Sequence, residues 1–300
     1  MNSKLFRGGY NFLGLADEDC RYEESKAAII PVPYDSTTSY RAGTREGPSA
    51  IISASRQVEL YDIQLKKEPL LSGLHTLPEV EPDMRGPKMT LQNVEKVVNT
   101  VVADGLFPVI LGGEHSISIA PVKALKKKFG NLSVLQIDAH ADLRDEFENT
   151  PHNHACVMRR IWDVANNIAQ VGIRNISAQE AKFIEENNHQ AIYWAHDISD
   201  PSNISWHESV INNLGDNVYI TIDLDGFDPS IMPAVGTPEP GGLQWHNSIE
   251  LLNKVIEQKN VIGFDVVELC PLPGNIVSDF FAAKLVFKLL GKIFTKNSWS

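Results

Sequence analysis

The segment LSVLQIDAHAD, residues 132–142, places three metal-binding side chains directly after an apolar run. The apolar part, Leu132–Ile137, has the character of a buried strand. Asp138, His140 and Asp142 then occupy every second position. Successive side chains of an extended chain point to opposite faces, so these three share one face. The segment therefore predicts a buried strand that directs two carboxylates and an imidazole to one point at its end.

Similar apolar runs recur along the chain and alternate with helical patterns. We predict strands at Ala27–Val32, Phe107–Leu111, Leu132–Ile137, Ile168–Ile173, Ala191–Trp194, Asn217–Ile222 and Val261–Val267. We predict helices from a cap at Thr90 to Gly105, after the capping boxes Ser177–Glu180 and Ser205–Glu208, and over Phe280–Phe294. This alternation indicates an α/β fold with a mostly parallel sheet covered on both faces. No repeat or linker interrupts it, so we expect one domain over residues 1–300.

More candidate ligands follow the other predicted strands, and in such sheets ligands bind outside the carboxyl ends of the strands. GGEHS, residues 112–116, DLD, residues 223–225, and Glu268 each come directly after a strand. The candidate metal ligands are His115, Asp138, His140, Asp142, Asp223 and Asp225. Four carboxylates exceed what one divalent ion needs, so we expect two ions. An oxygen-rich set without thiolates favours Mn²⁺ over structural zinc.

The composition narrows the class of protein. A net charge of −11 argues against a nucleic-acid partner, which calls for basic patches, and suits a small cationic substrate. Three cysteines, Cys20, Cys156 and Cys270, do not make a disulfide framework and indicate a reducing compartment. Met1–Tyr10 has no apolar signal region, and no stretch reaches the roughly 20 apolar residues of a membrane span. We therefore expect a cytoplasmic protein without a membrane partner.

Each motif taken singly has an ordinary structural explanation. DAHAD fits a surface strand end, GGEH fits a glycine-rich turn, and DLDGFDP fits a turn with Asx caps. His154 fits either a proton shuttle or a solvated loop histidine. Cys156 fits either a nucleophile or a buried thiol. The acidic loop 144–148 fits either a solvated face or a selector of cationic substrates. The coincidence of three motifs at strand ends favours a catalytic metal site.

Together these residues resemble the ureohydrolases, the family of arginase and agmatinase. Its signatures GGxHS, DAHxD and DxDxxDP followed by GTPxxGG occur here in order, as GGEHS, DAHAD and DLDGFDPSIMPAVGTPEPGG. The match spans His115 to Glu268 and extends upstream through residues 31–34 and 43–48. The resemblance implies a three-layer α/β/α sandwich of about eight mostly parallel strands. It also implies a homo-oligomer, either a trimer or a hexamer.

The resemblance further implies a role for each site residue. One Mn²⁺ would be held by His115, Asp138, Asp142 and Asp223, and the other by His140, Asp138, Asp223 and Asp225. Asp138 and Asp223 would bridge the two ions. His154 would carry protons, Glu268 would hold the guanidinium group of the substrate, and Asp142 would also accept a proton from the attacking hydroxide.

The loop after DAHAD bears on which guanidino compound is hydrolysed. Arginases carry Asn and Ser there to bind an α-carboxylate, whereas Asp145, Glu146 and Glu148 would repel one and suit an amine tail. We therefore expect hydrolysis of agmatine to putrescine and urea, with Arg144 as an opposing charge. DGFDPSIMPAVGTPEPGGL also resembles enzymes acting on N1-aminopropylagmatine, so this longer polyamine is the alternative substrate.

Three other classes of protein remain as rivals. A metallophosphoesterase would need strand-end Gly-Asp and Gly-His signatures that this sequence lacks. A thiol-dependent guanidine-modifying enzyme would use Cys156. A catalytically inactive homologue is disfavoured because every ligand position of the family is filled.

Overall fold

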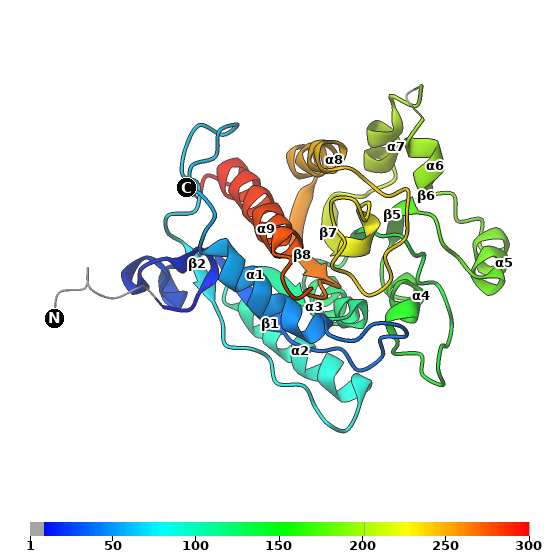
Figure 1. Ribbon diagram of the computed structural model, residues 1–300, viewed down its shortest axis with the longest axis horizontal. Coiled ribbons are helices and arrows are strands. Elements are labelled where there is room, and N and C mark those ends of the chain that lie inside the picture. Colours follow the sequence, from blue (N-terminus) through cyan, green and yellow to red (C-terminus); the bar gives the residue numbers. More distant parts are fainter. Residues whose placement is uncertain (1–8, 201, 300) are drawn as a thin grey trace.

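The computed structural model describes residues 9–200 and 202–299 (Figure 1). Most of the Met1–Tyr10 stretch thus lies outside the described residues. One eight-stranded sheet has the order β2-β1-β3-β8-β7-β4-β5-β6, and all neighbouring strands are parallel. The strands are β1 (Ala27–Val32), β2 (Leu74–Thr76), β3 (Phe107–Gly112), β4 (Ser133–Ile137), β5 (Asn167–Ile173), β6 (Ile192–Trp194), β7 (Asn217–Asp223) and β8 (Asn260–Val267).

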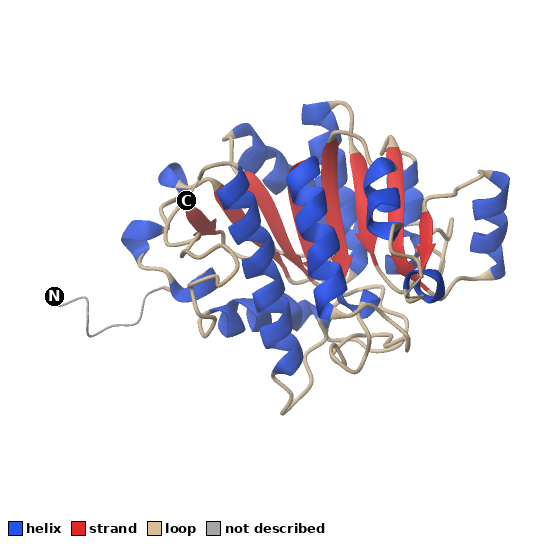
Figure 2. Ribbon diagram, turned by 90° about the horizontal axis from the view of Figure 1, so that it is seen from above, coloured by secondary structure: helices blue, strands red, loops and turns tan. Residues whose placement is uncertain are grey.

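Helices cover both faces of this sheet and make it the middle of three layers (Figure 2). The helices are α1 (Gly47–Ser55), α2 (Pro87–Ala103), α3 (Ile119–Phe129), α4 (Val157–Trp162), α5 (Ala178–Glu186), α6 (Ala195–Ile198), α7 (Trp206–Asn212), α8 (Trp245–Gln258) and α9 (Val277–Lys296). One apolar core packs the sheet against α1, α7, α8 and α9, and the other packs it against α2, α3 and α4. The predicted three-layer α/β/α fold is confirmed.

The predicted strands are all present, with ends that differ by at most one residue from those expected. The sequence did not reveal β2, which pairs with β1 at the edge of the sheet. This strand has three residues, of which only Leu74 is buried. A segment that short has no detectable period, so its pairing is decided by β1 beside it.

One predicted helix start and one predicted capping box are wrong, although the helix expected after Ser205 does begin at Trp206. Helix α2 begins at Pro87, whose ring presets a helical φ, and the Thr90 hydroxyl instead accepts a bond from the Asp83 backbone N–H at 2.9 Å. Ser205 precedes α7 but makes no capping bond, because its φ of −100° and ψ of 3° are not extended. The capping box of Ser177 and Glu180 is confirmed. Helix α9 extends beyond the expected Phe280–Phe294 at both ends.

The carboxyl ends of the strands all reach one edge of the sheet, where long loops gather (Figure 2). Gly113 sits at this edge between the ends of three strands. Its N–H donates to Val32 O of β1, and its carbonyl accepts from the backbone N–H of Glu268 after β8. A Cβ on Gly113 would lie 2.0 Å from Tyr34 O. The close approach of these backbones therefore requires glycine here.

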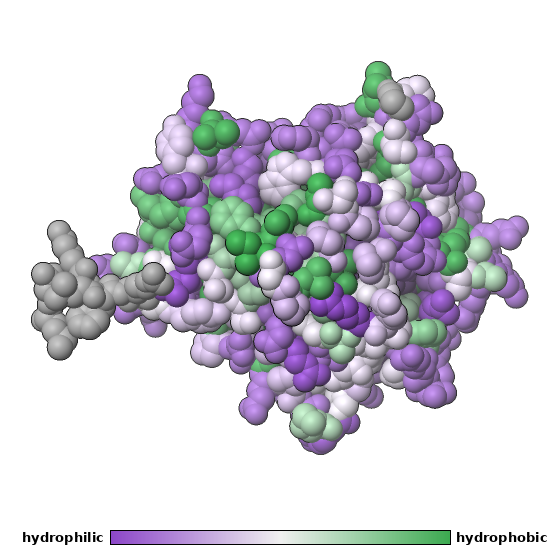
Figure 3. Space-filling model, in the orientation of Figure 1, coloured by the Kyte–Doolittle hydropathy of each residue, from purple (hydrophilic) through white to green (hydrophobic). Residues whose placement is uncertain are grey.

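The surface in the view of Figure 3 is mainly hydrophilic, with apolar side chains gathered around the middle of this face. Exposed apolar residues at the start of α9 include Ile276, Val277 and Phe280. Among the described residues, no helix is long and apolar enough to cross a membrane. The three cysteines are free, in agreement with the expectation that they form no disulfide framework.

We expect Gly113→Ala to lower the free energy of unfolding by about 1–3 kcal/mol or more, because the added methyl group overpacks a rigid backbone contact. Gly241→Ala is the control, since Gly241 has a φ of +80° but open space at the Cβ position. It should show only the cost of a left-handed alanine, roughly 1–2 kcal/mol. Urea unfolding of both variants measures the difference. Equal stability of the two would contradict the steric explanation.

Candidate metal centre

The candidate ligands come from the ends of the central strands of the sheet. His115 follows β3, Asp138 follows β4, Asp223 ends β7, and Glu268 follows β8. These strands are adjacent in the order β3-β8-β7-β4. Parallel pairing therefore brings residues from four distant parts of the sequence to one short stretch of the sheet edge.

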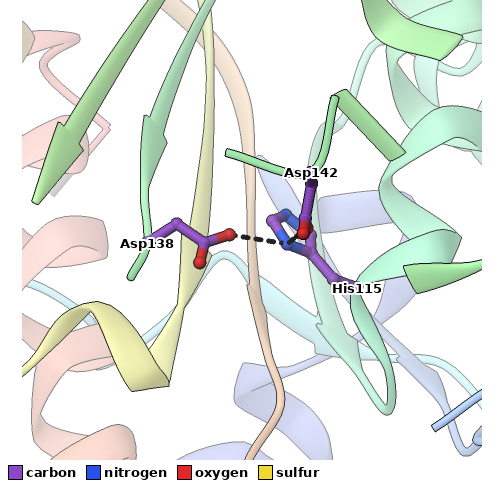
Figure 4. Close-up of side chains that lie close together, drawn as sticks. All are labelled: His115, Asp138 and Asp142. Carbon is purple, nitrogen blue, oxygen red and sulfur yellow. Dashed lines mark ion pairs between the residues drawn. The ribbon is translucent and has the colours of Figure 1, made fainter. Parts of the chain in front are cut away.

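A first group of ligands forms around His115, which is almost completely buried. Its Nδ1 lies 3.0 Å from Asp138 Oδ2, 3.1 Å from Asp142 Oδ2 and 3.4 Å from Asp223 Oδ2. Figure 4 shows the imidazole of His115 between the carboxylates of Asp138 and Asp142. This buried Nδ1 makes no hydrogen bond within the described structure. A nitrogen that faces three carboxylates without a hydrogen bond is placed as a metal ligand would be.

A second group forms around His140. Its Nδ1 lies 3.1 Å from Asp225 Oδ2 and 3.6 Å from Asp138 Oδ1. Asp138 therefore belongs to both groups, with one carboxylate oxygen facing each histidine. In each group of three, one ligand atom per residue lies within 4.8 Å of the others. The arrangement can hold two ions that share the Asp138 carboxylate.

The charges in the centre also fit cations. Burial, and after it the neighbouring Asp138 carboxylate, raise the pKa of the Asp142 carboxyl to about 7. Burial and the carboxylates of Asp225 and Asp138 raise the pKa of Asp223 well above its ordinary range. Crowded acids of this kind stay protonated unless positive charge is brought among them. Divalent ions supply that charge, so the donor set fits the expected pair of metals.

Backbone geometry fixes two of these acids in unusual conformations. Asp142 has a φ of +53° and Glu268 a φ of +66°, in the left-handed region that non-glycine residues rarely adopt. Glu268 is held there by its N–H bond to Gly113 O and by the His115 N–H, which donates to Glu268 Oε1 at 2.7 Å. Strain of this kind concentrates at functional sites.

Glu268 and His154 line the cavity beside the two ligand groups. His154 Nδ1 lies 3.9 Å from Glu268 Oε1, and its Nε2 forms a 3.2 Å hydrogen bond with Ser39 Oγ. Burial, and after it the charge of His140, lower the pKa of His154 to about 4. The structure therefore places His154 as a neutral imidazole next to the site and outside both ligand groups.

The acidic loop does not lie where the sequence suggested. Among the described residues that line the cavity are Arg144 and Phe147, but not Asp145, Glu146 or Glu148. The last three are exposed, and Asp145 forms an ion pair with Arg160 on the outside. The loop turns its acids to the surface and its guanidinium and aromatic ring to the cavity.

Sequence reasoning missed the acid that does reach this part of the cavity. Glu180, seen in the sequence only as a capping residue, is buried and lines the same cavity. Its Oε2 accepts bonds from the Ser177 N–H and hydroxyl, and its Oε1 accepts from the Leu143 N–H. Ser39 and Thr237 also line the cavity. Thr237 belongs to the GTPEPGG signature, but no sequence signal marked Glu180 or Ser39 as cavity residues, because segments distant in the chain bring them together.

Cys156 is placed as a packing residue. It is fully buried, and it is absent from the described cavity lining although Ala155 is present. Burial raises the pKa of its thiol to about 12, so the thiolate needed for nucleophilic attack is suppressed. The geometry disfavours the thiol-dependent mechanism.

Comparisons with known proteins agree with this geometry. The model of the arginase family matches residues 25–291. An N(1)-aminopropylagmatine ureohydrolase of Synechocystis sp. is 40% identical over 278 residues, covering 90% of each chain. An agmatinase of Pyrococcus horikoshii is 35% identical over 269 residues, covering 88% of this chain and 90% of the relative.

Solved structures give the same result. The agmatine ureohydrolase of Thermoplasma volcanium has a TM-score of 0.86 and 32% identity, covering 99% of this chain and 98% of its own. Arginase from Bacillus caldovelox has a TM-score of 0.76 and 26% identity, covering 89% of this chain and 98% of its own. The chain therefore belongs to the arginase family of ureohydrolases.

We expect the protein to bind two divalent ions roughly 3.5–4 Å apart, the usual spacing of two-metal sites. Asp138→Ala should lose both ions because its carboxylate serves both groups, whereas His140→Ala should lose one and keep the ion near His115. His196→Ala changes an exposed histidine and serves as control. Metal analysis after Mn²⁺ loading and desalting gives the stoichiometry. An Asp138→Ala protein with one tightly held ion would refute the shared ligand.

Proposed function

We propose that this protein is a binuclear manganese hydrolase that releases urea from the guanidinium group of a polyamine. The observation that carries the proposal is the pair of ligand groups that share Asp138. Residues of both groups line a cavity that is also lined by Glu268 and His154. We treat residues 1–300 as one ureohydrolase domain. A phosphoesterase reading has no support from the family match.

The ligand assignment follows the two groups. His115, Asp142, Asp138 and Asp223 would hold one Mn²⁺. His140, Asp225 and Asp138 would hold the other, together with Asp223, which the resemblance to the ureohydrolases adds to this second set. Ions bound in this way lower the pKa of water and so supply a nucleophile near neutral pH. The oxygen-rich donor set without sulfur is what favours manganese.

The side chains around the ligands would bind the substrate and move protons. Glu268 has one oxygen bound to the His115 N–H, which leaves its second oxygen to accept N–H bonds from the substrate guanidinium. Asp142 would accept the proton of the attacking water. His154, neutral at pH 7, would pass a proton at its ring nitrogens to the leaving amine, with Ser39 fixing the ring through Nε2. The cavity walls hold these groups in fixed orientation toward the guanidinium carbon.

Two polyamines are candidate substrates, agmatine and N1-aminopropylagmatine. Relatives named N(1)-aminopropylagmatine ureohydrolase include those of Synechocystis sp. and Thermus thermophilus, the latter at 33% identity, and these favour the longer substrate. The products would be urea and either putrescine or its aminopropyl derivative, spermidine. Either substrate has a cationic tail beyond the guanidinium, and the cavity must accommodate that charge.

We assign the tail-binding carboxylate to Glu180. Its charge lies in the cavity wall and is only loosely offset by Arg144, whose Nε is 3.8 Å from Glu180 Oε2. The Arg144 guanidinium also lies over Phe147, with Cζ 4.6 Å from the ring centroid, so part of its interaction is with that ring. A tail amine could thus approach Glu180, whereas the exposed acids of the loop would contribute only long-range, screened attraction.

The remaining expectations concern the surroundings of the enzyme. We propose a homo-oligomer in the cytoplasm, without nucleic-acid or membrane partners. The anionic net charge argues against a nucleic-acid partner, the three free cysteines fit a reducing compartment, and the oligomer is what the resemblance to the ureohydrolases implies. Light scattering of the purified protein measures the subunit number.

His154→Asn should lower kcat by about 10²–10⁴-fold, the usual contribution of general acid–base catalysis, while the metal content stays the same. Urea release and metal analysis on the same sample test this pair of outcomes. His152→Asn, two residues away, and Cys156→Ser are the controls and should be nearly silent. Loss of metal from His154→Asn would make His154 a ligand, and a dead Cys156→Ser enzyme with intact metal would restore the thiol mechanism.

Both polyamine substrates should exceed arginine in kcat/KM by about a thousandfold, because an unpaired carboxylate beside Glu180 costs several kcal/mol to bury. Glu180→Gln keeps an acceptor for the Ser177 cap but loses the one that the Leu143 N–H uses. Removal of the charge should narrow this gap by about tenfold, the effect of roughly 1.4 kcal/mol. Glu146→Gln removes the same charge from the exposed loop and should change little. A larger effect of Glu146→Gln would assign selection to the loop. Faster hydrolysis of 4-guanidinobutyrate than of either polyamine would instead mean that the preferred substrate has a carboxylate tail, which Arg144 binds.

A further inference from the structure

A pair of glutamines lies buried beneath the metal centre. Gln136 of β4 and Gln170 of β5 are direct partners in the sheet register, and both are completely buried. Their neighbours along these strands are aliphatic, such as Leu135, Ile137 and Val171. Neither amide belongs to the ligand groups or to the described cavity lining.

The hydrogen bonds of the pair all run in one direction. Gln136 Nε2 donates to Asp138 Oδ2 at 2.6 Å and to His140 O at 3.2 Å. Gln170 Nε2 donates to Gln136 Oε1 and, at 2.8 Å, to Ala141 O. His189 Nε2 lies 3.0 Å from Gln170 Oε1 and is its donor, because an amide oxygen can only accept. A chain of donors thus leads from His189 through both amides to Asp138.

These bonds hold the part of the chain that carries three ligands. The segment Asp138–Asp142 lies beyond the end of β4. Its backbone is joined to the β5 side by the isolated bridge between His140 and Asn175 and by bonds of the Asp138 N–H and the Ala139 carbonyl. The amides bind the carboxylate of Asp138 and two successive carbonyls, of His140 and Ala141. They therefore fix both the plane of the shared carboxylate and the path of the backbone behind it.

The pair is hard to explain by stability alone. A satisfied buried hydrogen bond adds little net stability, and two apolar residues of similar shape would serve the sheet nearly as well. Buried amide groups are more readily explained where their hydrogen bonds orient another functional side chain. Partners outside the ligand set commonly orient metal ligands, and their loss typically weakens metal binding or activity by about 10–100-fold.

We propose that Gln136 and Gln170 are positioning residues that orient the Asp138 carboxylate for both metal ions, with Gln170 setting the direction of the Gln136 amide. This inference rests on the proposed binuclear centre. Gln136 holds Asp138 Oδ2, the oxygen facing His115, and the carboxylate plane then presents Oδ1 to His140. Because both ions would share the Asp138 carboxylate, loss of the Gln136 amide should weaken the binding of both.

The test measures affinity for Mn²⁺ directly, by titrating the metal-stripped protein and following free Mn²⁺ by electron paramagnetic resonance. Gln136→Met fills the same space without donors and should weaken binding at both sites by about 10–100-fold. Gln170→Met should weaken it less, because Gln136 keeps its place but loses the bond that sets its direction.

Gln170→Glu gives the sharper result. A carboxylate at this position cannot donate to Gln136 Oε1, so the Gln136 amide should turn its NH₂ group toward it and present its oxygen to Asp138. We expect weaker Mn²⁺ binding than in Gln170→Met. Gln190→Glu, in the exposed loop next to His189, makes the same change of charge outside the network and should keep wild-type affinity.

Ser133→Ala controls for general destabilisation, since it removes a buried hydroxyl at the opposite end of β4 that accepts from the Gly215 N–H. Thermal unfolding without metal compares the folds of all variants. Wild-type Mn²⁺ affinity in Gln136→Met, or an equal loss in Ser133→Ala, would overturn the positioning role. A wild-type protein that binds fewer than two ions would instead overturn the binuclear centre itself. If Gln170→Glu does not fold, the comparison of Gln136→Met with Ser133→Ala still decides the question.

Discussion

The Asp138 carboxylate is the constraint on which the rest of the site depends. One of its oxygens faces His115 and the other faces His140. The distance between the two ligand groups is therefore limited by the width of one carboxylate. Gly226 and Asp225 both help to hold Asp138 in this position. Gly226 leaves room for the Asp138 backbone, because a Cβ there would come within 2.7 Å of Asp138 N. The Asp225 side chain accepts from the Ala139 N–H and fixes the second group to the first.

The parallel sheet explains how such a site can be assembled from distant segments. Hydrogen-bonded pairing holds the strand ends at fixed spacing, and side chains that follow those ends are brought together without long connecting loops. This assembly has an electrostatic cost, because the carboxylates brought together repel one another. Burying several carboxylates at one point raises the pKa of Asp142 and Asp223, so the centre gains by taking up divalent cations and losing protons.

Most of the fold and most of the candidate metal centre could be predicted from the sequence. Strands such as Ala27–Val32 and Asn217–Asp223 are long apolar runs, which give a strong signal. The ligands stand directly after them, so their positions follow from the topology. Helix starts were less certain, because caps depend on single backbone conformations. Thr90 and Ser205 both have side chains that can cap a helix. Helix α2 nevertheless begins before Thr90, at Pro87, and the φ and ψ of Ser205 prevent its capping bond to α7.

The sequence by itself determined which residue types stand at the strand ends, and therefore the kind of chemistry, because strand periodicity and the parallel sheet leave one edge for them. Only the tertiary structure decided which acid lines the cavity beside the candidate metal ligands. Asp145 turns outward to Arg160, while Glu180, from a different helix, reaches the wall beside Arg144. The direction of a loop side chain depends on contacts with residues far away in sequence, so no local pattern encodes it. The same holds for the Gln136–Gln170 pair, whose meaning appears only when β4 and β5 lie side by side.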